Sequence, residues 1–178
     1  VRSGTTWTLQ ARLSASDRED GDKFGAAVAI EGDNLIIGSP RDRNVGNSGV
    51  GSVDVFRRNG TAWTEEGKSR RNELGSGIDF ASTIDISGDR IIIGEPKSDV
   101  LGHSFQGAAY VFIHTGASWQ FQNKLTASNG AVADLLGWSV AIQDNRFLVG
   151  APWVDIGNNS NQGAAYFFIQ SPGVPDLQ

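Results

Sequence analysis

The stretch Gly107-Ala-Ala-Tyr-Val-Phe112 returns almost unchanged further along the chain as Gly163-Ala-Ala-Tyr-Phe-Phe168. The same interval, without any gap, relates further identical triples: Trp7, Trp63, Trp119; Gly38, Gly94, Gly150; Pro40, Pro96, Pro152. Chance identity in three copies is expected in roughly one column in a hundred. The period therefore marks a repeat protein, with copies at 1–56, 57–112 and 113–168, while 169–178 hold the end of the last strand and a linker-like tail.

Each copy contains four runs with the pattern of β-strands, which in the first copy are Thr6 to Ser14, Phe24 to Ile30, Leu35 to Ile37 and Ser52 to Phe56. The third run is continuously apolar, as in a strand covered on both faces. No segment shows a sustained helical period. A four-stranded meander cannot bury both faces alone, so we predict an all-β fold of three four-stranded antiparallel β-propeller blades. A β-solenoid is the alternative.

The amino-acid composition and net charge argue against several classes of function. The chain has 178 residues, 39% hydrophobic and 20% charged, which suits one packed domain. Its net charge of −5 argues against a nucleic-acid binder, and no apolar run is long enough for membrane insertion. The absence of cysteine excludes disulfides, thiolate metal sites and cysteine nucleophiles.

Short turns and long loops alternate along each copy. Pairs such as Gly32-Asp33 and Asn59-Gly60 suit tight hairpins. The longer connections, at 15–23 and 41–50 in the first copy and at equivalent positions in the others, alternate with them. In an antiparallel meander alternate connections lie at the same end, so we expect all the long loops to share one face of the protein.

Phe24-Gly25 followed by Gly38-Ser39-Pro40 resembles the signature of FG-GAP repeats, and the resemblance covers all three copies. Its structural positions are Phe24, Gly25, Gly38, Pro40, Phe80, Gly94, Pro96, Gly137, Gly150, Pro152, Trp7, Trp63 and Trp119. Such repeats form the propeller of integrin α subunits and of related bacterial secreted proteins, typically with seven blades. The resemblance implies an extracellular or cell-surface module for protein binding or adhesion.

Calcium is the cofactor that the resemblance raises, because integrin-type blades often carry an Asp-rich loop between the two signature strands. Here that position holds only short turns such as Glu31-Gly32-Asp33-Asn34. Calcium needs about 6–8 oxygen ligands, which these turns do not supply. Asp17, Asp20 and Asp22 are weak metal candidates in a loop that does not recur, and a solvated acidic loop is the alternative. No cofactor is expected.

Three blades do not close a ring by themselves, because propellers have about 4–8 blades. In a propeller, the strand at Thr6 to Ser14 belongs spatially to the preceding blade, while the third copy lacks a following strand of this kind. Two interpretations stay open. The remaining blades could come from a larger parent chain, or a head-to-tail homodimer could close a six-bladed ring.

The long loops carry the candidate binding residues. Asp99 and Asp155 are equivalent, and Asp42 lies near the same position in the first copy. These carboxylates could form a ring that binds a cation or a basic partner. Alternatively, each could accept hydrogen bonds from the backbone of its own loop. His103, Phe105 and Trp153 are further candidates. Exposed aromatics anchor partners or sugar rings, although these two could fold over a neighbouring blade instead.

Nothing in the sequence supports catalysis, since His103 and His114 have no accompanying nucleophile, zinc or phosphate motif. We therefore predict a non-catalytic extracellular interaction module that binds an unidentified protein or glycan on the long-loop face. The alternatives are a purely structural repeat segment of a surface protein and a lectin-like or enzyme-accessory propeller.

Overall fold

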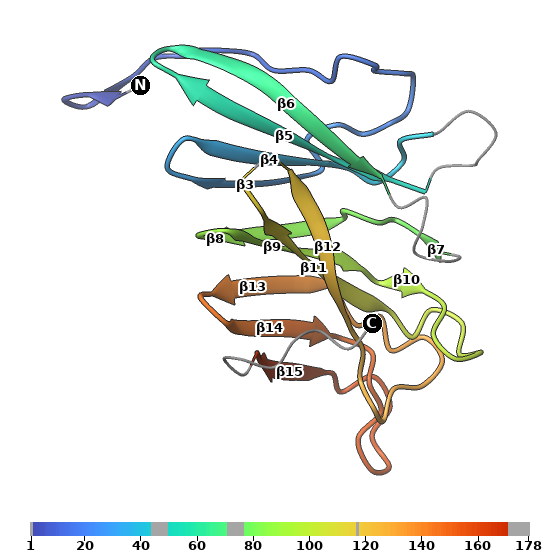
Figure 1. Cartoon of the computed structure of the whole chain (residues 1–178). Helices are drawn as coiled ribbons and strands as arrows, with labels where there is room; N and C mark the ends of the chain where they lie inside the picture. The colour runs from blue at the N-terminus through green and yellow to red at the C-terminus, as the bar shows by residue number, and fades with distance from the viewer. Residues whose placement is uncertain (1, 44–49, 71–76, 117, 171–178) are drawn as a thin grey trace.

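A computed structural model describes residues 2–43, 50–70, 77–116 and 118–170, and the regular elements in these ranges are all β-strands (Figure 1). Three antiparallel sheets follow one another along the chain and are stacked in the order of the sequence. The prediction of an all-β propeller-blade architecture is confirmed. Within the described ranges no helix is long and apolar enough to cross a membrane.

The first blade is a four-stranded meander in the order β3-β4-β5-β6. Its strands are β3 (Ala27–Glu31), β4 (Asn34–Ser39), β5 (Ser52–Asn59) and β6 (Ala62–Arg70). The β3–β4 turn has Gly32 at φ +57° and the β5–β6 turn has Gly60 at φ +63°. Both glycines thus adopt the left-handed conformation that such tight hairpins require, as the sequence predicts.

The second blade repeats this order with four strands, and the third has three in the described residues. The strands of the second blade are β8 (Thr83–Ser87), β9 (Arg90–Glu95), β11 (Ala108–His114) and β12 (Trp119–Leu125). Those of the third are β13 (Ser139–Gln143), β14 (Arg146–Ala151) and β15 (Ala164–Ile169). β8 packs against β3 on one side and β13 on the other, so the first strands of the blades lie innermost.

The blades bury one core on each side of the second blade. Ile91 and Ile93 on β9 belong to the core shared with the first blade, whereas Ile92 between them belongs to the core shared with the third. Successive side chains of a strand point to opposite faces. This explains why the third run of the repeat is continuously apolar, and burial of each isoleucine stabilises the stack by about 1.5–3 kcal/mol.

Gly38 and Gly94, two members of the Gly38, Gly94 and Gly150 column, let neighbouring blades approach closely. A Cβ atom at Gly38 would lie 2.3 Å from the carbonyl oxygen of Ala81, and one at Gly94 would lie 2.1 Å from that of Gly137. Backbone of the next blade occupies the space that a side chain would need. The glycine of the signature is therefore a blade-to-blade contact.

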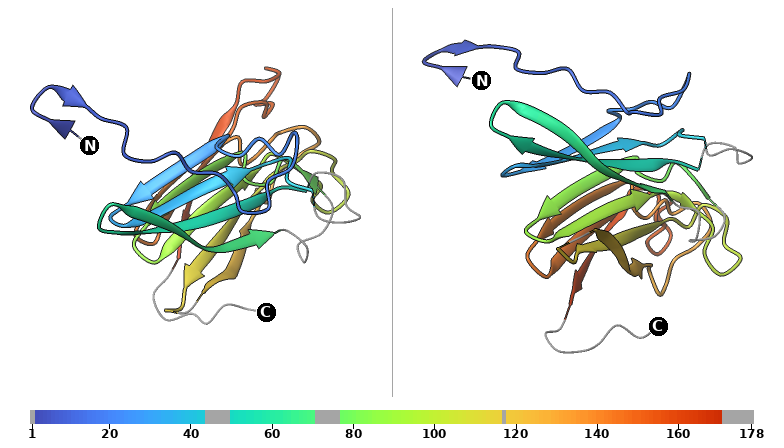
Figure 2. Two further views of the ribbon diagram at one scale, coloured as in Figure 1. Left: turned by 90° about the horizontal axis from the view of Figure 1, so that it is seen from above. Right: turned by 45° about the horizontal axis from the view of Figure 1, so that its top comes forward.

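The N-terminal segment departs from the predicted strand at Thr6 to Ser14. Only Thr6–Trp7 (β2) is a strand, and it pairs with Arg2–Ser3 (β1) in a short hairpin. Figure 2 shows this hairpin extending away from the stacked sheets. The counterparts β6 and β12 are complete strands because β5 and β11 pair with them. Residues 8–14 have no such neighbouring strand within the described chain, so their backbone is not held in a ladder.

The repeated tryptophans have different surroundings. Trp119 packs against the core between the first two blades, and Trp63 lies under the guanidinium of Arg58, 5.9 Å from its ring centroid. Trp7 is 78% exposed. Sequence reasoning treats all three as structural, yet in this chain Trp7 supports no described packing.

The remaining short strands, β7 (Gly77–Ile78) and β10 (Lys97–Ser98), pair with each other.

Candidate binding face

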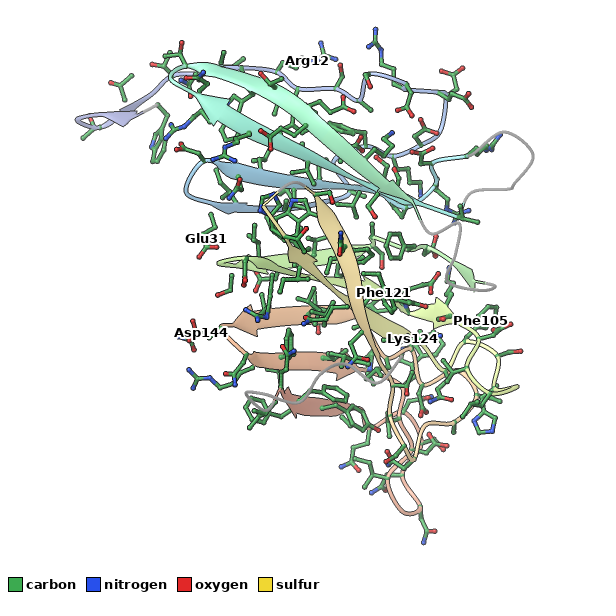
Figure 3. All side chains as sticks on the ribbon, in the orientation of Figure 1. Arg12, Glu31, Phe105, Phe121, Lys124 and Asp144 are labelled. Carbon is green, nitrogen blue, oxygen red and sulfur yellow. The ribbon has the colours of Figure 1, made fainter. Side chains whose placement is uncertain are left out.

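The described parts of the long loops lie at one end of the blades, as predicted; residues 44–49 and 71–76 of two of these loops lie outside the described residues. The loop after β12 donates hydrogen bonds from Ala133 N and Leu135 N to the carbonyls of Ser104 and Phe105, at 3.0 and 3.1 Å. Figure 3 places Phe105 at this end and, at the other, Glu31, which ends β3, and Asp144, which lies in a short turn. The long-loop face is therefore a continuous surface built from neighbouring blades.

Asp99 and Asp155 perform the same task in equivalent loops. The Asp99 carboxylate accepts a hydrogen bond from Phe105 N at 3.0 Å, and that of Asp155 accepts one from Asn161 N at 2.7 Å. Each bond spans six residues and closes its loop. The interpretation of these residues as caps of their own loops thus has a direct structural basis. Both aspartates are exposed.

Trp153 stands at the edge of a shallow groove of about 160 Å³ between the loops 127–135 and 152–162. Its side chain is 51% exposed. The groove also contains exposed Val132 and the polar side chains of Asn129, Asp155 and Asn161. An indole face beside an apolar side chain and several hydrogen-bonding groups has the composition of a small binding site.

The other aromatic and histidine candidates lie on the preceding loop. Phe105 is exposed and has φ +56°, and its backbone is held by Asp99 and Leu135. His103 binds the carbonyl of Gly130 through Nδ1 at 2.9 Å. His103 therefore ties two loops together, and Phe105 is presented on a backbone that is restrained on both sides.

Trp138 also lies at this end, but it does not fill space within the described fold. It is exposed and lines a second open groove of about 370 Å³ with Asp79, Pro96 and Lys97. Trp138 replaces the small residues Ala26 and Ser82 of the other two copies, which predicts a side chain that fills extra space beside the central channel. Its exposure adds an aromatic side chain to the long-loop face.

The third aspartate candidate, Asp42, is buried in an ionic cluster. Its carboxylate accepts hydrogen bonds from Ser52 Oγ at 2.5 Å and from Lys68 Nζ at 3.0 Å. Lys68 Nζ also pairs with Asp17 and lies 3.2 Å from Asp54 Oδ1. Asp42 is thus paired with Lys68 within its blade and does not extend the surface formed by the other two loops.

The fully buried Asp54 carboxylate has unusual electrostatics. Burial raises the pKa of Asp54 to about 6, and the neighbouring Lys68 ammonium offsets only part of that effect. Burial lowers the pKa of Lys68, but hydrogen bonds to Asp17 and Asp42 outweigh it and hold that pKa above its usual range. The cluster links strands β5 and β6 to the loops that carry Asp17 and Asp42 through ionic contacts.

The second blade keeps the cation and changes its surroundings. Lys124, the counterpart of Lys68, has Nζ 5.5 Å from the ring centroid of Tyr110, the counterpart of Asp54. Tyr110 donates its hydroxyl hydrogen to the buried Glu95 at 2.8 Å. Sequence reasoning missed both buried polar clusters, although the two lysines occupy equivalent positions of the repeat and so offered a signal.

The acidic loop does not bring its carboxylates together. Asp17 pairs with Lys68, while Asp22 is buried and accepts a hydrogen bond from Glu19 N at 2.6 Å. Asp20 is exposed. Among the described residues no group of three or more histidine or acidic side chains is arranged to hold a metal ion. The two histidines also have separate partners: His114 packs against Trp119 with ring centroids 5.0 Å apart and ring planes tilted by 50°, whereas His103 binds the carbonyl of Gly130.

The FG-GAP repeat family model matches residues 7–56, 63–112 and 119–168, in phase with the strands, glycine contacts and turns described above. The chain belongs to the FG-GAP repeat family. FG-GAP repeats are typically interaction modules of extracellular or surface proteins and are generally non-catalytic. A comparison with curated proteins gave no match.

Among solved structures, this FG-GAP protein is similar to the crystal structure of Saccharomyces cerevisiae Sqt1, with 11% identity and a TM-score of 0.46. The similarity covers 84% of this chain and 37% of that one. The chain therefore spans little more than a third of the length of that structure.

Proposed function

We propose that this FG-GAP protein is a non-catalytic extracellular interaction module that binds a protein or glycan on its long-loop face. The observation that carries the proposal is the groove beside Trp153. There an exposed indole lies next to Asn129, Asp155 and Asn161 on loops that hydrogen bonds hold in place. Binding residues are often found on loops that a rigid scaffold positions.

The size and lining of the groove favour a small ligand group with both polar and apolar atoms over an extended ligand surface. Its volume of about 160 Å³ suits one sugar ring or one ligand side chain rather than a buried substrate. The carboxylate of Asp155 is already used to close its loop, so it offers the ligand an oriented acceptor at little further entropic cost. Phe105 and Trp138 provide apolar surface elsewhere on the same face.

A glycan array and a titration against the best glycan or protein hit test this proposal. Trp153→Ala is expected to weaken binding by about tenfold or more, since an aromatic anchor often dominates a small interface. Trp153→Phe should retain part of the affinity. Leu101→Ala is the matched control, because Leu101 is exposed on the same face outside the groove.

Two results would contradict the binding function. One is the absence of any saturable ligand in either format, which would favour a purely structural role for the repeats. The other is a ligand whose affinity is equal for the wild-type chain and for Trp153→Ala. In that second case the module would bind through a surface other than this groove.

A further inference from the structure

The outward face of the third blade is apolar and uncovered in the described chain. Leu148 and Phe167 are exposed on it, Phe167 at 60%. Their counterparts one repeat earlier, Ile92 and Val111, are buried in the core against the third blade. The counterparts of the same positions in the first copy, Ile36 and Val55, are buried against the second blade. This face is therefore a blade-to-blade face that lacks its neighbour.

The opposite face of the first blade is its complement. Val28 is 62% exposed and Ile30 is similarly exposed. Their counterparts in the second blade are Ile84 and Ile86, which pack in the core between the first two blades. The chain thus shows both halves of one recurring contact, with one half uncovered at each end of the stack.

The glycines at the blade-to-blade contacts also indicate that each end of the stack has an uncovered face. Gly38 faces the backbone of Ala81, and Gly94 faces that of Gly137. A Cβ atom at Gly150 would meet only Ser139 of its own blade. The matching position for Gly150 is Gly25, around which a Cβ atom would meet nothing within 4 Å. The space beside Gly150 and beside Gly25 is therefore not occupied by a neighbouring blade, unlike the space at the equivalent contacts Gly38–Ala81 and Gly94–Gly137.

In the described residues, the third blade also has no counterpart of the outer strands β6 and β12. In the second blade His114 pairs with Trp119 and Ile113 pairs with Gln120. Transferring this register by the repeat interval places Trp7 opposite Gln170 and Thr8 opposite Ile169. Beside β15 lies a groove of about 250 Å³ lined by Val111, Leu125, Phe147, Phe168, Ile169 and neighbouring residues.

The chemistry of the transferred register is complementary. Arg12 would lie opposite Tyr166, just as Lys124 lies opposite Tyr110 and 5.5 Å from its ring centroid. Arginine binds an aromatic face at least as well as lysine does. Leu9 would take the place of Phe121, which packs edge-on against Phe112 at 5.9 Å. Arg12, Phe121 and Lys124 can be followed in Figure 3.

We propose that a second copy of this chain occupies these surfaces. Residues 6–14 of one copy form the fourth strand of the partner's third blade, and the first blade of that copy covers the partner's uncovered face. The contact joins different surfaces, so it must close to avoid a filament. Two copies supply six blades, the only multiple of three within the usual range of about 4–8.

Light scattering coupled to size-exclusion chromatography of the 178-residue chain is the first test. We expect a species of twice the 19.0 kDa chain mass over a wide concentration range. Phe167→Asp and Val28→Asp should each raise the concentration needed for dimer formation by about tenfold or more, since each places a charge in an apolar contact. Both residues are exposed, so the circular dichroism of the monomer should stay unchanged.

Engineered cysteines test the register, because the chain has no cysteine of its own. In the double variant Thr8→Cys/Ile169→Cys, the two thiols should face each other across the new strand pair, within the reach of a disulfide. We expect a covalent dimer under oxidising conditions. The control is Thr8→Cys/Ser160→Cys, since Ser160 is exposed on a distant loop.

The outcomes are decisive in both directions. A dimer that cross-links through positions 8 and 169, but not in the control, supports the proposal. A stable monomer at all concentrations overturns it, and points to other blades as the natural neighbours of these surfaces. A ladder of larger covalent species overturns the closed ring. A dimer unaffected by Phe167→Asp and Val28→Asp must use a different interface, which also overturns the proposal.

Discussion

The carboxylate of Asp54 and the ammonium of Lys68 face each other across β5 and β6, with Lys68 Nζ 3.2 Å from Asp54 Oδ1. The register that pairs them also pairs Tyr110 with Lys124 in the second blade. The equivalent positions of the outer strands β6 and β12 therefore both carry a lysine, whereas the residue paired with it changes from Asp54 to Tyr110. In the first blade the pair is buried, which makes it sensitive to pH and to substitution.

Protonation of Asp54 should make the stability of the protein depend on pH. Its pKa is about 6 in the folded state and 3.8 in the reference state, so between these values the folded state holds more protons than the unfolded state. The free energy of unfolding then falls as pH rises from about 4 to 6, by an amount bounded at about 3 kcal/mol.

Urea titrations across this pH range measure the effect. Asp54→Asn should remove this component of the slope, whereas Asp20→Asn, at an exposed position, should leave it unchanged. Equal slopes in the wild-type chain and in Asp54→Asn would contradict the assignment to Asp54.

Loss of the Lys68 ammonium should destabilise the first blade strongly. Lys68→Met leaves the carboxylates of Asp42 and Asp54 buried without their cation, and removing one partner of a buried pair costs about 3–5 kcal/mol. The midpoint of urea unfolding measures this cost. Lys68→Met/Asp54→Leu should recover part of it, because the carboxylate of Asp54 is removed as well while that of Asp42 remains. No recovery would show that the interaction with Asp54 is not the source of the cost.

Two glycine-to-alanine substitutions should differ in sign or size because only one of them meets a neighbouring blade. A methyl group at Gly94 would lie 2.1 Å from the Gly137 carbonyl oxygen, so Gly94→Ala should cost about 1–3 kcal/mol or more. Gly67 on β6 has nothing within 4 Å of such a group. Gly67→Ala should be neutral or stabilising by up to about 1 kcal/mol. Equal thermal midpoints for the two variants would refute the close blade contact.

Calcium should leave the thermal stability of the chain unchanged. Asp17 is paired with Lys68, while Asp99 and Asp155 close their own loops, so these carboxylates do not converge on a common point. A ligand that binds only the folded state would raise the melting temperature. Differential scanning fluorimetry with millimolar calcium or with a chelator checks this. A calcium-dependent rise that Asp155→Ala abolishes would restore the cation-site interpretation.

The sequence alone determined the repeat and the kind of element in it. The regular period, tight Gly-Asp and Asn-Gly turns and the continuously apolar runs such as Ile91 to Ile93 predict strands, their order and the end that carries the long loops. These features are local or periodic. They can be seen in one dimension because turn geometry and alternating burial impose them on neighbouring residues.

Only the tertiary structure decided which side chains have partners. Trp7 has the same sequence position as Trp119, yet it is exposed because no strand lies beside residues 8–14 in the described chain. Asp42 and Asp99 look alike in sequence, but one is buried against Lys68 and the other closes a surface loop. Long-range packing sets these differences, because burial and charge pairing depend on contacts between blades and strands that the repeat period does not contain.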